Sequence, residues 1–146
     1  MERKKQAAIS CFQNGFNCSQ AVLSTFSEEL GLTTETALKI STCFGGGMRN
    51  GEVCGAITGG LMVIGLKYGH SKQGDDTTKT RAYQLTREFT QQFKEKHGTL
   101  LCRQLLGYDL SDPEQLAIIK EKQLFDTICP RIIEDVVEMV EKVGRE

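Results

Sequence analysis

Residues 54–66 read Cys-Gly-Ala-Ile-Thr-Gly-Gly-Leu-Met-Val-Ile-Gly-Leu, and this stretch decides the fold. Apolar and small residues do not alternate along it, so the pattern does not indicate a β-strand. The stretch is too short and too rich in glycine for a comfortable membrane span, and Glu52 and Lys67 lie just outside its ends. We therefore predict a central helix, buried on most sides, in which Gly55 and Gly59 let another backbone or a cofactor come close.

A glycine-rich loop precedes this helix and reads Cys-Phe-Gly-Gly-Gly-Met-Arg-Asn-Gly over residues 43–51. Three consecutive glycines and an Asn-Gly pair cannot form an ordinary helix interior. The loop lacks the Gly-Lys-Ser/Thr ending of a Walker phosphate loop, and no βαβ pattern surrounds it as in a Rossmann fold. Two interpretations stay open: the loop forms an anion-binding nest, or it folds tightly over the sulfur of Cys54.

Helix signals continue on both sides of this centre. Asn17 is typical of a helix N-cap, Asp75 or Asp76 precedes a long polar helix, and the segment Ser111-Asp112-Pro113-Glu114 reads as a capping box. Further helices are expected over residues 3–14, 18–30, from 33–36 into 43, from 75–76 to 97, 102–107, 113–122 and 130–143. Because no segment alternates as a strand does, we predict an all-α fold. It is a single domain, residues 1–146, of about six or seven helices around the buried central helix.

Composition narrows the classes of function. The 146 residues include 18 Lys and Arg against 19 Asp and Glu, a formal charge of −1. This balance gives no electrostatic reason to expect a nucleic-acid partner, and there is no polybasic membrane anchor. The first residues carry no apolar signal-peptide core, so we expect a cytoplasmic protein without a transmembrane segment. In a reducing compartment, the six cysteines do not indicate a disulfide framework.

Three of the six cysteines fall at expected helix starts. Cys18 follows the N-cap Asn17, Cys54 lies where the glycine-rich loop turns into the central helix, and Cys129 precedes Pro130. The free N–H groups and the positive dipole at a helix start lower the pKa of a thiol. We therefore predict that Cys54 and Cys129 react near pH 6 before a mid-helix thiol such as Cys11. The alternative is that these cysteines are small apolar residues that fill a core.

Metal ligation is a second interpretation of the cysteines. The separations between Cys43, Cys54, Cys102 and Cys129 match no short zinc knuckle, and no Cys-x-x-Cys-His segment attaches haem. A four-thiolate site for a metal ion or an iron–sulfur cluster could still assemble from separate helices. His70 and His97 have no partner at metal-ligand spacing, so we interpret them as structural.

The order Cys43, Cys54-Gly55-Ala56-Ile57-Thr58-Gly59, Cys102, Cys129 resembles the C_GCAxxG_C_C family. Its members are small proteins described as redox-active and named for a CGAxxG motif and four separated cysteines. The resemblance implies that Cys43, Cys54, Cys102 and Cys129 are the functional residues. It also implies that Cys18 is a frequent fifth. We take Gly55, Gly59 and Cys18 as the candidate cofactor-binding residues. Cys11 has no counterpart in this pattern, and haem is not implied.

We therefore expect a redox-active protein with a convergent cysteine site for thiol–disulfide or electron-transfer chemistry. In the thiol version Cys54 attacks and Cys43 resolves, because the loop between them can double back and bring their Cα atoms within about 7 Å. The alternatives are a metal or iron–sulfur protein that uses Cys43, Cys54, Cys102 and Cys129 as ligands, and a helical adaptor with structural thiols. The redox partner and the cofactor stay open, and a homo-oligomer is compatible with the sequence.

Overall fold

The computed structural model describes residues 1–145, and within them helices dominate. The α-helices are α1 (Glu2–Gln13), α2 (Cys18–Ser27), α3 (Thr34–Ser41), α4 (Gly55–Tyr68), α5 (Asp76–His97), α6 (Cys102–Leu106), α7 (Pro113–Glu121), α8 (Leu124–Thr127) and α9 (Cys129–Lys142). Three shorter turns are η1 (Glu28–Leu30), η2 (Thr42–Phe44) and η3 (Gly47–Gly51). This part of the chain holds no strand, only an isolated bridge between Val53 and Leu101. The all-α prediction is confirmed.

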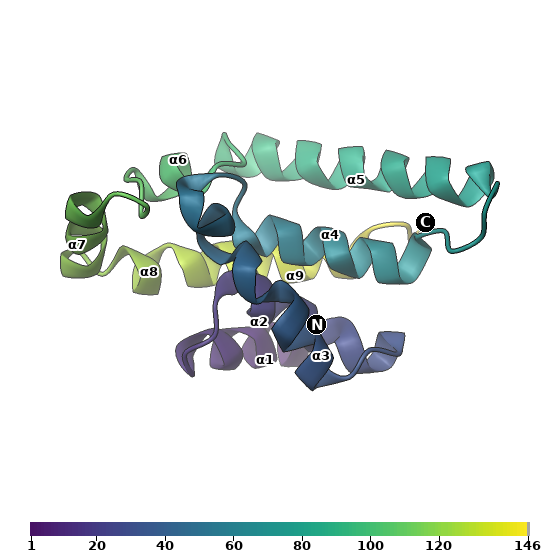
Figure 1. The fold of residues 1–146 in the computed structure, drawn as a ribbon, viewed down its shortest axis with the longest axis horizontal. Helices are drawn as coiled ribbons and strands as arrows, with labels where there is room; N and C mark the ends of the chain where they lie inside the picture. Colours follow the sequence, from purple (N-terminus) through teal and green to yellow (C-terminus); the bar gives the residue numbers. More distant parts are fainter. Residues whose placement is uncertain (146) are drawn as a thin grey trace.

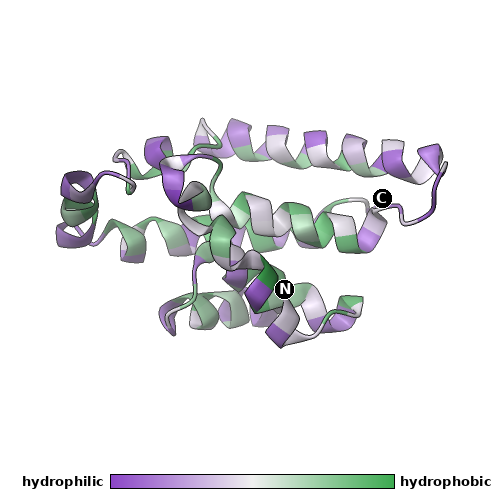
Figure 2. Ribbon diagram, viewed as in Figure 1, coloured by the Kyte–Doolittle hydropathy of each residue, from purple (hydrophilic) through white to green (hydrophobic). Residues whose placement is uncertain are grey.

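Helix α4 is the buried centre of the molecule, as predicted. In Figure 1 it runs between the long helix α5 on one side and helices α1–α3 on the other. It packs most extensively against α2 and also contacts α5 and α9. Its own residues are largely apolar (Figure 2), and only Gly65 and Leu66 near its C-terminal end are exposed. No helix in the described residues is both long and apolar enough to cross a bilayer.

Two adjacent glycines let α4 approach different neighbours. A Cβ on Gly59 would lie 2.7 Å from the carbonyl oxygen of Ser19 in α2. A Cβ on Gly60 would lie 2.9 Å from Cζ of Phe89 in α5 and 3.1 Å from Cγ1 of Val136 in α9. Each glycine costs about 1 kcal/mol of helix propensity relative to alanine. The close packing of α4 against three helices offsets that cost, because any side chain here would hold the helices apart.

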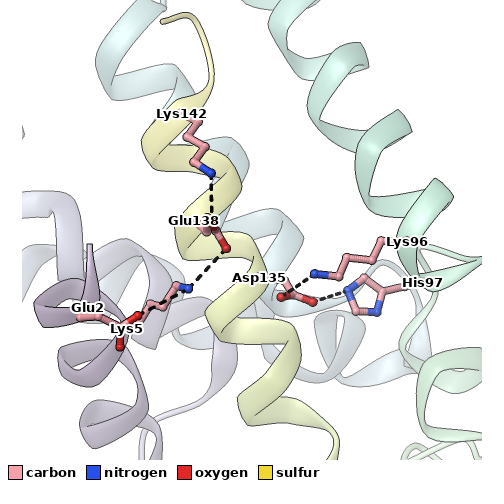
Figure 3. Close-up of polar contacts among 7 residues, drawn as sticks. All are labelled: Glu2, Lys5, Lys96, His97, Asp135, Glu138 and Lys142. Carbon is pink, nitrogen blue, oxygen red and sulfur yellow. Dashed lines mark hydrogen bonds and ion pairs between the residues drawn. The ribbon is translucent and has the colours of Figure 1, made fainter.

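Helix α9 presents an apolar face to the core and a charged face to its neighbours. Its buried residues are Ile132, Ile133, Val136, Val137 and Val140. On the charged face, shown in Figure 3, Glu138 pairs with Lys5 of α1 at 3.3 Å. Asp135 pairs with Lys96 and with Nε2 of His97 from the end of α5, both at 2.9 Å. His97 therefore has the structural role predicted for it.

Asn17 holds the start of α2 in a reciprocal capping box. Its side chain accepts a hydrogen bond from the backbone N–H of Gln20, and the Gln20 side chain accepts one from the N–H of Asn17, both at 2.9 Å. Asn17 also donates to the carbonyl oxygen of Thr42 at 2.8 Å. The predicted N-cap is confirmed, and it additionally ties α2 to η2.

The Asn17→Ala variant is expected to lose about 2 kcal/mol of unfolding free energy, the upper end for removal of an N-cap. The expected loss is high because the variant also leaves the Thr42 carbonyl without its partner. Thr33→Ala is the control, since Thr33 caps the exposed start of α3 by accepting from the N–H of Thr36 and donating to its hydroxyl, both within one helix start. It should lose about 1 kcal/mol or less. Equal losses in equilibrium urea unfolding would contradict the second role of Asn17.

Candidate functional site

Four of the six cysteines line one pocket of about 350 Å³. The pocket lies where the starts of α2 and α4 meet α6 and the junction of α8 with α9. The four thiols are those of Cys18, Cys54, Cys102 and Cys129. Most of the remaining wall is apolar and includes the aromatic rings Phe12, Phe16 and Phe125. The pocket thus combines several sulfurs with an apolar interior.

Cys18 and Cys54 meet because two helix starts converge. Cys18 is the first residue of α2, and Cys54 is the N-cap of α4. Between them there is no room for a side chain on Gly55, because a Cβ there would lie 2.5 Å from Sγ of Cys18. The glycine that follows Cys54 in the CGAxxG motif therefore makes space for a second sulfur.

Backbone pairing brings Cys102 alongside Cys54. The N–H of Cys54 donates to the carbonyl oxygen of Leu100 at 2.8 Å. The N–H of Cys102 donates to the carbonyl oxygen of Glu52 at 2.7 Å. Two short segments that are far apart in the sequence are thereby held side by side. This pairing could not be recognised from periodicity, since it involves only the residues around a single bridge.

A hydrogen bond between the thiols of Cys18 and Cys54 shifts their pKa values in opposite directions. The Cys54 thiol and the N–H groups of Gly46, Ser19 and Cys18 stabilise the Cys18 thiolate and lower its pKa to about 6, against the effect of burial. The pKa of Cys54 is raised well above its ordinary value, because Cys54 donates that hydrogen bond and is itself buried. These two directions favour the negative charge at Cys18 and the proton at Cys54.

The other two pocket cysteines stay protonated. Burial raises the pKa of Cys102 to about 12, with a further contribution from the negative charge at Cys18. Burial also raises the pKa of Cys129. The lowered pKa predicted for Cys54 and Cys129 is therefore wrong. At Cys129 the cause lies in the preceding residue. Ile128 has a right-handed helical backbone and connects α8 directly to α9, so α9 lacks the free helix start that would stabilise a thiolate.

Cys43 and Cys11 lie apart from the pocket wall. Cys43 is exposed in η2 and does not line the pocket, although Cα of its neighbour Gly45 would lie 2.8 Å from a Cβ on Gly55. Cys11 is half-buried on α1, and its Sγ lies 3.6 Å from Oγ of Ser24. The structure thus brings three of the four predicted site cysteines together and adds Cys18 to them.

The described residues do not fit a metal centre. Nowhere in residues 1–145 do three or more His, Cys, Asp or Glu side chains lie in positions that could hold a metal ion. The donor set predicted for a cluster also includes Cys43, which is exposed and does not line the pocket that the other three thiols line. No step of the chemistry is therefore assigned to a metal or to an iron–sulfur cluster.

Arg49, which no sequence motif indicated as a site residue, also lines the pocket. Gly46, Gly47, Met48 and Arg49 all have positive φ and form a turn of left-handed helix. Each of the two non-glycine residues costs about 1–2 kcal/mol in this conformation. The turn folds the Arg49 guanidinium back over Gly46, with Nη1 3.4 Å from the carbonyl oxygen of Gly45. The run of glycines was the one signal of this turn.

The fold and the site define a class: a small all-α protein whose helix starts gather cysteines around an apolar pocket. A family model described as "Putative redox-active protein (C_GCAxxG_C_C)" matches residues 16–143. The chain belongs to this C_GCAxxG_C_C family, as the sequence predicted, and redox activity is the function that the family description carries. No curated protein matches the chain, and no solved structure does.

Proposed function

We propose that this protein is a dithiol–disulfide redox protein and that Cys18 and Cys54 are its reacting pair. The observation that supports this most directly is that Cys18 and Cys54 lie at two converging helix starts in the wall of one pocket, with Sγ of Cys18 against Gly55, the residue that follows Cys54. The proposal replaces Cys43, the resolving partner expected from the sequence, with Cys18. It also exchanges the expected roles, since Cys18 becomes the attacking thiolate and Cys54 the resolving thiol.

The reaction follows from the distribution of charge in the pair. The Cys18 thiolate attacks one sulfur of a disulfide R–S–S–R, forming a Cys18–S–S–R mixed disulfide and releasing R–S⁻. The Cys54 proton passes to the released R–S⁻, and the resulting Cys54 thiolate attacks the Cys18 sulfur. The second R–S⁻ leaves and takes a proton from solvent. Two electrons have moved from the protein dithiol to the organic disulfide, and the protein holds a Cys18–Cys54 disulfide.

Two features of the pocket suit this chemistry. Backbone N–H groups of Gly46 and Ser19 stabilise the negative charge of the Cys18 sulfur. Protonated Cys102 and Cys129 complete the wall and do not compete as nucleophiles near neutral pH. An adaptor with structural thiols would not require a stabilised thiolate that borders a pocket.

Mild oxidation tests the proposal. The reduced protein is treated with bis(2-hydroxyethyl) disulfide, quenched in acid, alkylated, and mapped by mass spectrometry. We expect a Cys18–Cys54 disulfide and two molecules of 2-mercaptoethanol released per chain. Cys43→Ser should give the same product at the same rate, whereas Cys18→Ser should not form it. A Cys43–Cys54 disulfide, or full retention of six thiols, would contradict the proposed pair.

A further inference from the structure

Two opposite charges border the cysteine pocket. Arg49, from the left-handed turn, and Asp126, from α8, both line it, and both side chains are exposed to solvent. Neither forms an ion pair with any described residue. The two charges influence different thiols. The positive charge of Arg49 lowers the pKa of Cys102, and the negative charge of Asp126 raises the pKa of Cys129. The pocket therefore has a positive and a negative group available for a ligand.

The pocket interior limits the size and character of such a ligand. A volume of about 350 Å³ lies at the lower end for small-molecule sites. The interior between the two charges is formed by thiols and by apolar groups such as Phe12, Phe125 and Ile132. A fitting molecule is thus small, carries charges of both signs at its periphery, and has an uncharged centre that can contact Cys18.

We propose that the pocket binds a small disulfide of the α-amino-acid type. One carboxylate of the disulfide pairs with Arg49, one ammonium group pairs with Asp126, and the sulfur–sulfur bond lies against Cys18. This assignment rests on the proposed function of the Cys18–Cys54 pair and names its substrate class. The reduction of one such disulfide yields two molecules of the amino-acid thiol and the Cys18–Cys54 disulfide, so electrons and protons balance as in the general reaction.

Four disulfides separate the two charge contributions. L-Cystine carries carboxylates and ammonium groups, 2,2′-dithiodiacetate carries carboxylates alone, cystamine carries ammonium groups alone, and bis(2-hydroxyethyl) disulfide is uncharged. The rate of Cys18–Cys54 disulfide formation is measured with each and divided by the rate of the same disulfide with free 2-mercaptoethanol. This ratio removes intrinsic differences in reactivity among the four reagents.

We expect the highest normalised rate with L-cystine. Arg49→Gln should lower the normalised rates with L-cystine and with 2,2′-dithiodiacetate by about five-fold each, the size expected for loss of one partly exposed ion pair. Asp126→Asn should lower the normalised rates with L-cystine and with cystamine to a similar extent. The uncharged disulfide should react equally with all variants, which controls for any general change in the Cys18 thiolate. Arg87→Gln, which removes an exposed charge on α5 away from the pocket, is the matched control.

The outcomes distinguish the two proposals. If all four disulfides form the Cys18–Cys54 bond with equal normalised rates that neither variant changes, the substrate class is wrong and the redox pair stands. Equal slowing of all four reagents by Arg49→Gln would also overturn the substrate class, because it would show an effect on the thiolate alone. If none of the four disulfides forms the Cys18–Cys54 bond, the proposed function itself fails.

Discussion

In the Cys54→Ala variant, alkylation of Cys18 at pH 6 is expected to slow by about ten-fold. The Cys54 thiol makes the largest contribution to the lowered pKa of Cys18, which is about 6 in the native pair. Without that hydrogen bond, we expect the pKa to return toward about 8, so the thiolate fraction at pH 6 falls from about one half to about 1%. A more basic thiolate is also a better nucleophile, and this offsets part of the roughly 50-fold loss.

The pH profile of alkylation checks the sign of this effect. A thiol with a lowered pKa is ionised above that pKa, so wild-type Cys18 should react with a midpoint near pH 6. In Cys54→Ala the midpoint should move upward by at least one pH unit. Cys11→Ala is the matched control, because Cys11 contacts Ser24 rather than Cys18 and its removal should leave the midpoint in place. An unchanged midpoint in Cys54→Ala would show that the backbone N–H groups alone stabilise the thiolate.

Replacing Gly59 with leucine is expected to lower the free energy of unfolding by about 3 kcal/mol, the upper end for overpacking. The added Cβ would approach the backbone oxygen of Ser19 to 2.7 Å and Cβ of Val22 to 3.2 Å. A backbone group cannot rotate away as a flexible side chain can, so α2 and α4 must separate. This cost exceeds the gain in helix propensity, which is about 1 kcal/mol or less.

Gly65→Leu is the matched control for this substitution. Gly65 lies in the same helix, is exposed, and would have no atom within 4 Å of an added Cβ. The free energy of unfolding of the Gly65→Leu variant should therefore rise by about 0.5–1 kcal/mol through helix propensity alone. Equilibrium urea unfolding of both variants gives the comparison. Similar stabilities of Gly59→Leu and wild type would mean that the α2–α4 contact is open and could serve as a ligand groove.

Most of the helices could be predicted because their start and stop signals are local. Asn17 caps α2 through Gln20, three residues away, and Gly98 with φ +83° ends α5 as its position suggests. The signal at Ser111–Glu114 was less accurate. There Asp112 is the N-cap and accepts from the N–H of Glu114, whereas Ser111 donates to Asp109 outside the helix. Neighbouring capping residues compete for one role, and the sequence does not rank them.

The arrangement of the cysteines around Cys54 could not be predicted from proximity along the chain alone. The ten residues between Cys43 and Cys54 suggested a close pair. In the structure, however, η2 leaves Cys43 exposed while the start of α2 brings Cys18 to Gly55. The helical state of Ile128 likewise removed the free helix start expected at Cys129. Both differences depend on how helices are joined and packed, which periodicity does not describe.

The sequence by itself determined the all-α class, the buried glycine-rich helix and the family, and the four cysteines that line the pocket were all among its candidate residues, with Cys18 as the fifth. These features follow from local capping, from glycine placement and from a motif within one segment. The tertiary structure alone decided that Cys18 shares a pocket wall with Cys54, in which direction their pKa values shift, and that Arg49 and Asp126 border the same pocket. The physical reason is that a pKa and a binding site depend on groups brought together from distant segments, and in this protein the close approach of α2 to α4 at Gly55 and Gly59 sets that arrangement.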